Sequence, residues 1–320
     1  MNNDQDHELA GDGAELKADG TPHALALTAL IAGAVTLGMS PIFVRLSELG
    51  PTATAFHRVF LALPVIWVWY IVDTRRQNPA GTLLSRPETS RDYIYLSLAG
   101  VFFAGDLAFW HWSLKFTSVA NATLFATLAP IWVTLGSFLI FKERFSLVFL
   151  MGVALAITGG GILMGDSFQI GGEHLFGDVL GVVTGLFFGS YILTVGRLRN
   201  RFSTAAIMFY STLVTAAVLV PVTFLSGESW VATTLYGWFI LFGLAWFTHV
   251  GGQGALAFAL AHLPAAFSSV AVLLEAVAAA GLAWLILDEA LGSMQILGAL
   301  IVIGGIMIAR RGSRKGRAHG

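Results

Sequence analysis

Ten apolar stretches follow one another along the chain and are separated by short polar segments. A helix needs about 20 apolar residues to cross the hydrocarbon core of a bilayer, so each stretch predicts one membrane-spanning helix. Almost none of the chain is left for a soluble domain. The predicted spans are 24–45, 52–72, 93–116, 118–141, 146–164, 176–196, 204–225, 235–261, 264–287 and 293–309.

The composition supports this interpretation. Hydrophobic residues make up 56% of the chain, charged residues 12%, and the mean hydropathy is +0.76. Charged residues reach about a quarter of a typical soluble domain. The chain has no cysteine, which excludes disulfides, thiolate metal sites and cysteine nucleophiles. The predicted fold class is therefore an all-α integral membrane protein with ten transmembrane helices.

The sequence repeats itself with an offset of 146 residues. Each copy holds five spans, and an odd number forces the second copy to enter the membrane the opposite way up. We therefore predict a disordered tail at 1–23, a first repeat at 24–165, a second, inverted repeat at 176–309 and a basic tail at 310–320. The residue pairs that carry the repeat are Gly105 and Gly251, Ala120 and Ala266, Glu143 and Glu289, Gly152 and Gly298, and Gly159 and Gly305.

The distribution of basic residues predicts the orientation. Of the 18 lysines and arginines, fifteen lie in the tails and even-numbered loops, whereas the odd-numbered loops hold only Arg45 and Lys115. The positive-inside rule then places both termini in the cytoplasm. We expect this multi-pass protein to lie in the inner, or plasma, membrane. The first 23 residues lack the positive region of a signal peptide. The five bases after Ala309 are expected to contact anionic lipid and not nucleic acid.

Asp106, close to the middle of the third span, is the strongest pointer to a site. A carboxylate at that depth costs at least ~2.5 kcal/mol, so it must face a cavity or a partner. Trp110 follows four residues later on the same helix face. The alternative is a structural pair in which Asp106 locks helices together through Arg58. For Arg58 itself, the sequence favours an ion pair with Glu48 near the end of the helix.

Polar groups recur in four other spans. Thr123, Thr127 and Thr134 form a stripe that either lines a pathway or bonds to a neighbouring helix. His249 and Gln253 lie one turn apart in the eighth span, and Glu275 lies in the middle of the ninth. In the sixth span Phe188 and Tyr191 are candidate cavity walls, and the glycines spaced four apart favour close helix packing. Those glycines are Gly177, Gly181, Gly185 and Gly189.

These features together resemble the EamA-type branch of the drug/metabolite transporter superfamily. Within it, the aromatic residues Phe109, Trp110, Phe188 and Tyr191 are similar to those of aromatic amino acid exporters of the YddG type. The resemblance implies export of small metabolites by alternating access, around a cavity drawn from spans 1, 3, 4, 6, 8 and 9. The second repeat departs from the pattern, because Ala276 stands where the first has Pro130, so a symmetric proline hinge lacks support. The residues that carry the resemblance are Arg58 with Pro64, 120–122 through Pro130 to 142–144, 152–165, and the second-repeat segments 265–289 and 298–305.

The leading hypothesis is an amino acid exporter for aromatic or bulky apolar substrates. A zwitterion needs acceptors for its ammonium group, donors for its carboxylate and aromatic walls for a ring. Such a cavity also suits an organic cation, so multidrug export is the alternative. The predicted acceptors are Asp106 and Glu275, the donors His249, Gln253 and Arg45, and the walls Trp110, Phe188 and Tyr191, with Thr127 on the pathway.

The sequence argues against an enzyme. The segment before Asp106 lacks the first glycine of a Gly-x-Gly-Asp protease motif, and no His-Glu-x-x-His motif or lysine-bearing phosphate loop occurs. A channel would favour a ring of like charges, which is also missing. We therefore expect no cofactor, no metal and no nucleic acid. The expected partners are a small-molecule substrate and membrane lipid, and a monomer is sufficient.

Overall fold

The computed structural model describes residues 20–76, 83–117, 119–164, 175–287 and 292–317. Within these residues, ten helices are long and apolar enough to cross a membrane, which confirms the all-α membrane fold. The predicted spans agree with the observed ones to within a few residues. The observed spans are His23–Leu46, Pro51–Arg76, Ser90–Phe116, Ala122–Phe141, Leu147–Met164, Leu175–Leu198, Thr204–Ser226, Leu235–Ala259, Ala265–Ile286 and Ser293–Ser313.

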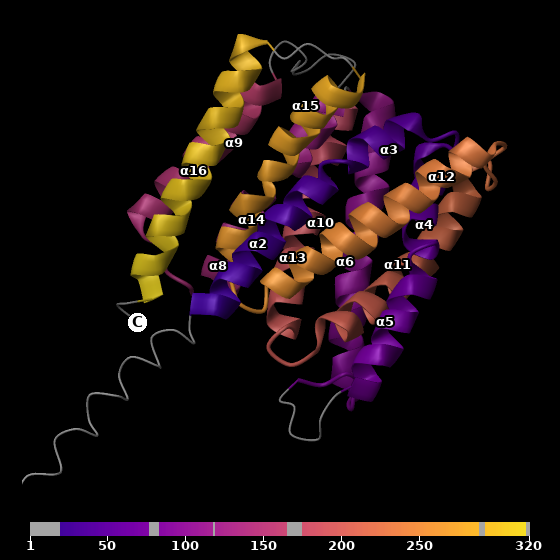
Figure 1. Ribbon diagram of the computed structural model, residues 1–320, viewed down its shortest axis with the longest axis horizontal. Helices are drawn as coiled ribbons and strands as arrows, with labels where there is room; N and C mark the ends of the chain where they lie inside the picture. The colour runs from indigo at the N-terminus through magenta and orange to yellow at the C-terminus, as the bar shows by residue number, and fades with distance from the viewer. Residues whose placement is uncertain (1–19, 77–82, 118, 165–174, 288–291, 318–320) are drawn as a thin grey trace, which may run out of the picture.

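Several spans are interrupted, whereas others are continuous helices (Figure 1). Backbone breaks at membrane depth are tolerated only where protein or a cavity surrounds them, so each break is informative. The interrupted spans are the first, α2 (Gly20–Leu37) and α3 (Ser40–Leu46); the second, α4 (Pro51–Phe60) and α5 (Leu63–Arg76); the fourth, α7 (Val119–Ala126) and α8 (Ala129–Phe141); and the ninth, α14 (Ala265–Val272) and α15 (Leu274–Leu287). The eighth consists of α12 (Leu235–Gly243), the π-helix η3 (Leu244–Gln253) and α13 (Gly254–Ala259), and the continuous spans are α6 (Ser90–Phe116), α9 (Leu147–Met164), α10 (Leu175–Leu198), α11 (Thr204–Ser226) and α16 (Ser293–Arg317).

The breaks in the fourth and ninth spans correspond to each other. Leu128 lies between α7 and α8, and Leu273, one residue from its repeat equivalent, lies between α14 and α15. At both breaks the backbone tightens to bonds between residues three apart, from Leu128 to Phe125 at 3.2 Å and from Leu273 to Val270 at 3.1 Å. A break at this position of the repeat therefore does not always depend on a proline. The second repeat makes a matching one without proline.

Helices α9 and α16 pack with their backbones in contact (Figure 1). A Cβ atom added to Gly152 would lie 2.3 Å from the amide nitrogen of Ala309, and one added to Gly305 would lie 2.5 Å from that of Ala156. Small residues permit this approach, which replaces the missing hydrophobic driving force between helices in lipid. The predicted glycine ridge of the sixth span also packs closely, within the chain, against α6, α7 and α8.

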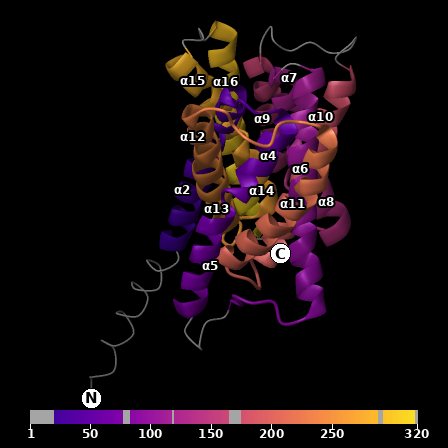
Figure 2. The ribbon, with the colours of Figure 1, turned by 90° about the vertical axis from the view of Figure 1, so that its right-hand side faces the viewer.

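The loops meet at two opposite ends of the bundle. Two even-numbered loops contact each other, because the Leu84 nitrogen donates to the Arg201 oxygen at 2.7 Å. A third even-numbered loop contacts the last turns of α16, where Ser146 Oγ donates to the Gly312 oxygen at 3.0 Å. The start of α2 and the end of α16 lie toward this same end, which we call the base-rich face (Figure 1). Figure 2, turned by a quarter, shows the helices running between the base-rich face and the opposite face.

Candidate functional site

A small cavity of about 60 Å³ lies in the interior of the bundle, at the breaks of the first, fourth and ninth spans. One water needs roughly 10–15 Å³ of such volume, whereas pockets for drug-sized ligands reach about 300–1,000 Å³. The cavity therefore has room for a few water molecules and is too small for a drug-sized ligand in this conformation. It is lined by Leu37, Ser40, Arg58, Asp106, Leu107, Trp110, Thr123, Ala126, Thr127, Ala129, Pro130, Phe188, Gln253, Ser269, Val272, Leu273 and Glu275.

Three charged side chains face this cavity. Arg58 is 4% exposed and donates from Nη1 to Ser40 Oγ at 2.9 Å, whereas Asp106 and Glu275 are half-buried. Among the ion pairs of the described residues, none joins Arg58 to a carboxylate within 4.0 Å, and its Nε makes no hydrogen bond. One guanidinium and two carboxyl groups are thus held around a common space without a direct ion pair between them. Intramembrane charges of this kind typically mark a substrate or ion site.

The helix breaks add a second source of polarity. The half-helices α8 and α15 begin at Ala129 and Leu274, and residues of their first turns, Pro130 and Glu275, line the cavity. The amino end of a helix carries a partial positive charge and unsatisfied N–H groups. In discontinuous transporter helices such ends favour an anionic group of the substrate. At the two helix starts the Ile131 nitrogen already donates to the Leu128 oxygen at 2.9 Å, and the Ala276 nitrogen to the Leu273 oxygen at 3.1 Å. The Arg58 guanidinium is thus the positive group that the cavity offers to a carboxylate.

Two aromatic side chains, Trp110 and Phe188, form part of the cavity wall. Tyr191 does not line the cavity. Its ring lies behind the wall, 6.3 Å from the Phe188 ring centroid and 4.9 Å from that of Phe103. Tyr191 is 2% exposed and supports the aromatic layer instead of offering its face to the cavity.

His249 also lies behind the wall. Its Nε2 is 2.9 Å from Thr212 Oγ1, and its ring centroid is 5.3 Å from that of Phe103. Gln253, one turn later, does line the cavity, and its Oε1 makes no hydrogen bond within the described residues. Both residues belong to the π-helix η3, a geometry that is rare and concentrated at functional sites.

Six of the eight site residues predicted from the sequence line the cavity: Asp106, Trp110, Thr127, Phe188, Gln253 and Glu275. The pairing expected for Arg58 was wrong, because Glu48 bonds to Thr233 and Thr234 in another loop. Arg45, a predicted donor, is exposed at the end of α3 and does not line the cavity. One sequence feature could have indicated that Arg58 faces the cavity: it is the one base that lies inside a predicted span.

Glu48 closes the bundle at the opposite face. It accepts hydrogen bonds from the backbone nitrogen atoms of Thr233 at 2.9 Å and Thr234 at 3.2 Å, and from both threonine hydroxyls. Nearby, Glu228 accepts from the Ala53 nitrogen at 2.9 Å and from Lys115 Nζ at 2.7 Å. These carboxylates tie the loop after the seventh span to the first three spans.

We expect Glu48→Gln to loosen this closure. The hydrogen bond from the Thr234 hydroxyl, together with those from Thr233, holds the pKa of Glu48 below its usual range. The stabilisation is therefore complete at neutral pH and is lost only as the pH falls through that lowered pKa. Hydrogen exchange at neutral pH should show faster exchange at Thr233, Thr234 and Gly237 in the variant. Unchanged exchange, with Glu143→Gln as the control at the other face, would contradict the role assigned to Glu48.

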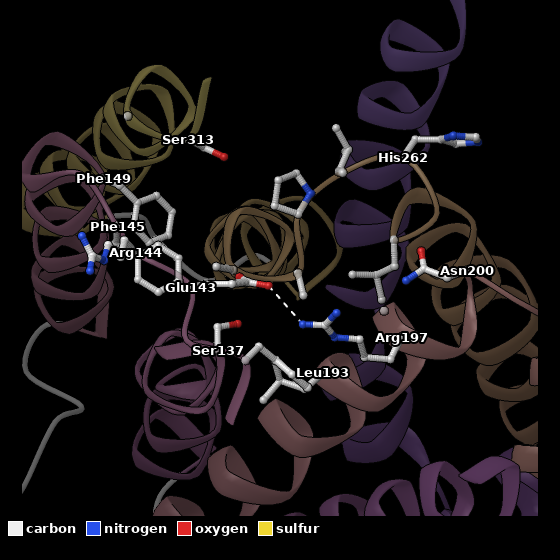
Figure 3. Close-up of a pocket in the computed structure, with 18 of the residues that line it drawn as sticks. Ser137, Glu143, Arg144, Phe145, Phe149, Leu193, Arg197, Asn200, His262 and Ser313 are labelled. Carbon is white, nitrogen blue, oxygen red and sulfur yellow. Dashed lines mark hydrogen bonds and ion pairs between the residues drawn. The ribbon is translucent and has the colours of Figure 1, made fainter. Parts of the chain in front are cut away.

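A larger hollow of about 420 Å³, which we call the vestibule, opens at the base-rich face. Figure 3 shows Glu143 and Arg197 reaching toward each other across it, with the carboxylate 3.3 Å from the guanidinium nitrogen. Ala266 lines the vestibule and Ser269 lines the central cavity, and both lie on α14. Three residues of helix rise about 4.5 Å, so only a thin barrier separates the two hollows.

Comparisons with known proteins agree with this architecture. The chain matches the EamA-like transporter family over residues 24–164 and 175–311. An uncharacterized transporter of Archaeoglobus fulgidus is 23% identical over 88% of this chain and 95% of its own length; a second from that organism is 28% identical over 63% of this chain and 66% of its own. A pseudopaline exporter of Pseudomonas aeruginosa, CntI, is 26% identical over 70% of this chain and 76% of its own. A crystal structure with 17% identity superposes with a TM-score of 0.74 and covers 94% of this chain and 99% of the other.

Proposed function

Because the chain belongs to the EamA-like transporter family, we propose that it exports small zwitterionic metabolites, in particular amino acids with aromatic or bulky apolar side chains. The protein is a multi-pass membrane transporter and not an enzyme. Its place in the inner membrane, with both termini in the cytoplasm, is part of the proposal and rests on the excess of bases at one face. The similarity to a pseudopaline exporter supports outward transport of a small metabolite.

The observation that carries the proposal is the position of Arg58 opposite Asp106 and Glu275. A zwitterion presents a carboxylate and an ammonium group a few ångströms apart. The guanidinium matches the carboxylate, and the two acids match the ammonium. Trp110 and Phe188 then offer apolar contact to the substrate's side chain.

Arg58 also distinguishes the proposal from multidrug export. An organic cation would pair with the two carboxylates, but it would leave the buried guanidinium without an anionic partner and would be repelled by it. The guanidinium already lacks a carboxylate within 4.0 Å in the described structure, so a ligand with a carboxylate would supply its missing partner, whereas a cationic ligand would add repulsion between like charges. The cavity therefore favours a ligand that carries both charges.

Alternating access follows from the helix breaks and the two faces. The described conformation is closed at the opposite face by Glu48 and Glu228, and its vestibule lies one helix turn from the cavity. A substrate enters through the vestibule once α14 moves away from the cavity. The two repeats then rock around the site, so that the contacts at the opposite face open and those at the base-rich face close.

Transport into liposomes tests the proposal. Reconstituted protein should take up radiolabelled phenylalanine saturably, and unlabelled amino acids should compete better than a cationic dye. Asp106→Asn should abolish most of this uptake, because it removes the carboxyl group whose negative charge would pair with the ammonium group. Glu88→Gln, an exposed carboxylate outside the cavity, is the matched control and should leave uptake unchanged. Transport of the dye without transport of amino acids would overturn the proposal in favour of multidrug export.

A further inference from the structure

A third hollow, of about 1070 Å³, opens on the side of the bundle near the base-rich face. Its floor is α10, and α6 and α8 form its sides. Helix α10 packs against each of the other two (Figure 2). Tyr95 is 55% exposed and Ile140 69%, so the hollow faces the surroundings of the bundle and not its interior. We propose that this lateral groove binds one anionic phospholipid from the membrane leaflet at the base-rich face.

The length of the groove fits one leaflet. Its wall on α6 extends from the first turn at Ser90 to Phe102, a rise of about 18 Å for 12 residues. Half of a hydrocarbon core of about 30 Å is roughly 15 Å. The hydroxyls of Ser190 and Thr194 on the floor donate to carbonyl oxygens of their own helix, at 2.8 Å each. Away from the end that holds the arginines, the groove is thus an apolar surface suited to acyl chains.

The rim of the groove is positively charged. Arg91, Arg197 and Arg201 line it, with Asp92 as the one carboxylate among the lining residues. Asp92 is already engaged, since it accepts from Arg201 at 3.1 Å and from the amide nitrogen of Thr89, which caps α6. Arg91 is exposed, and Arg197 is shared with Glu143 of the vestibule. Basic pockets between transmembrane helices at the membrane interface select anionic headgroups.

The groove is separate from the proposed substrate site. It shares no lining residue with the central cavity, whereas it shares Phe141, Leu193 and Arg197 with the vestibule. A headgroup bound at the rim would therefore contact the arginine that pairs with Glu143. The phosphate and the Glu143 carboxylate would compete for the Arg197 guanidinium.

Photocrosslinking locates the lipid directly. The full-length protein, freed of endogenous lipid in detergent, is incubated with a phosphatidylglycerol that carries a diazirine on its acyl chain, then irradiated and mapped by mass spectrometry. We expect labelling to concentrate on 90–102 and 190–202, and unlabelled phosphatidylglycerol to compete at least fivefold better than phosphatidylcholine. Labels spread evenly over the apolar surface, or equal competition by the two lipids, would overturn the proposal.

Charge removal tests the rim. Native mass spectrometry should show that Arg91→Gln/Arg197→Gln weakens binding of phosphatidylglycerol by roughly fivefold for each arginine, the effect of about 1 kcal/mol. Arg75→Gln/Arg76→Gln removes the same charge from exposed positions on α5, outside the groove, and should leave this site unchanged. Equal weakening in both double variants would mean nonspecific attraction and would overturn the assignment, as would labelling of the groove by phenylalanine analogues in place of lipid.

Discussion

Replacing Arg58 by glutamine is expected to lower amino acid uptake by about 10- to 100-fold. Arg58 is the one base that lines the central cavity in the described part of the chain. A hydrogen bond to a charged partner contributes about 1.5–3 kcal/mol, and a factor of ten corresponds to about 1.4 kcal/mol. The loss should appear mainly as weaker competition by unlabelled phenylalanine in the liposome assay.

Arg58→Gln should weaken binding of amino acids but strengthen binding of cations. Without the guanidinium, the cavity has no positive side chain and still has the carboxyl groups of Asp106 and Glu275. A cationic dye should therefore compete better than it does with the unchanged protein. Arg58→Lys is the matched control. It keeps the charge but loses the planar fork that holds a carboxylate by two bonds, and should retain an intermediate uptake.

A structural role for Arg58 would give a different outcome. Its one hydrogen bond runs from α4 to Ser40 of α3, and Ser40→Ala breaks that bond without removing the charge. If Arg58 only held these helices together, Ser40→Ala and Arg58→Gln would lower thermal stability equally, and the selectivity between amino acids and the dye would not move. That pattern would refute a direct contact between Arg58 and the substrate.

The spans and six cavity residues could be predicted because a membrane imposes two simple constraints on a chain, and both can be recognised in the sequence. Apolar length fixes a span, and a polar group at mid-depth, such as Asp106 or Glu275, must face protein. The partner of Arg58 could not be predicted in this way. Its position depends on the breaks in the first and second spans. Pro41 and Pro64 mark those breaks in the sequence, but a proline does not give the direction in which the next half-helix continues.

The second layer of the site escaped prediction for a related reason. His249 and Tyr191 are polar and buried, as several residues that line the cavity are. Helical spacing alone does not distinguish a residue that lines the cavity from one that packs behind the lining residues. The π-helix η3 turns His249 toward Thr212 and leaves Gln253 on the cavity. A local change of helix type of this kind has no periodic signature in the sequence. The break at Leu273 was hidden too, because no proline marks it.

Gly305→Leu is expected to destabilise the protein strongly, whereas Gly304→Leu, one residue earlier, should be tolerated. A Cβ atom at Gly305 meets the backbone of Ala156 on α9 at 2.5 Å, and one at Gly304 meets nothing within 4 Å. Backbone atoms do not move aside as a flexible side chain does, so leucine at Gly305 must push α16 away from α9. Overpacking of a well-packed contact costs about 1–3 kcal/mol, and here the separation would extend along the whole helix pair.

The two variants add the same side chain to the same helix, so their difference isolates the contact with α9. Thermal unfolding of the purified protein should show a lower midpoint for Gly305→Leu only. Transport should fall in the same variant, because Gly312, farther along α16, lines the vestibule and its carbonyl oxygen accepts from Ser146. Equal midpoints for the two variants would mean that α9 and α16 are not in backbone contact. A lower midpoint with unchanged transport would instead remove α16 from the wall through which substrate enters.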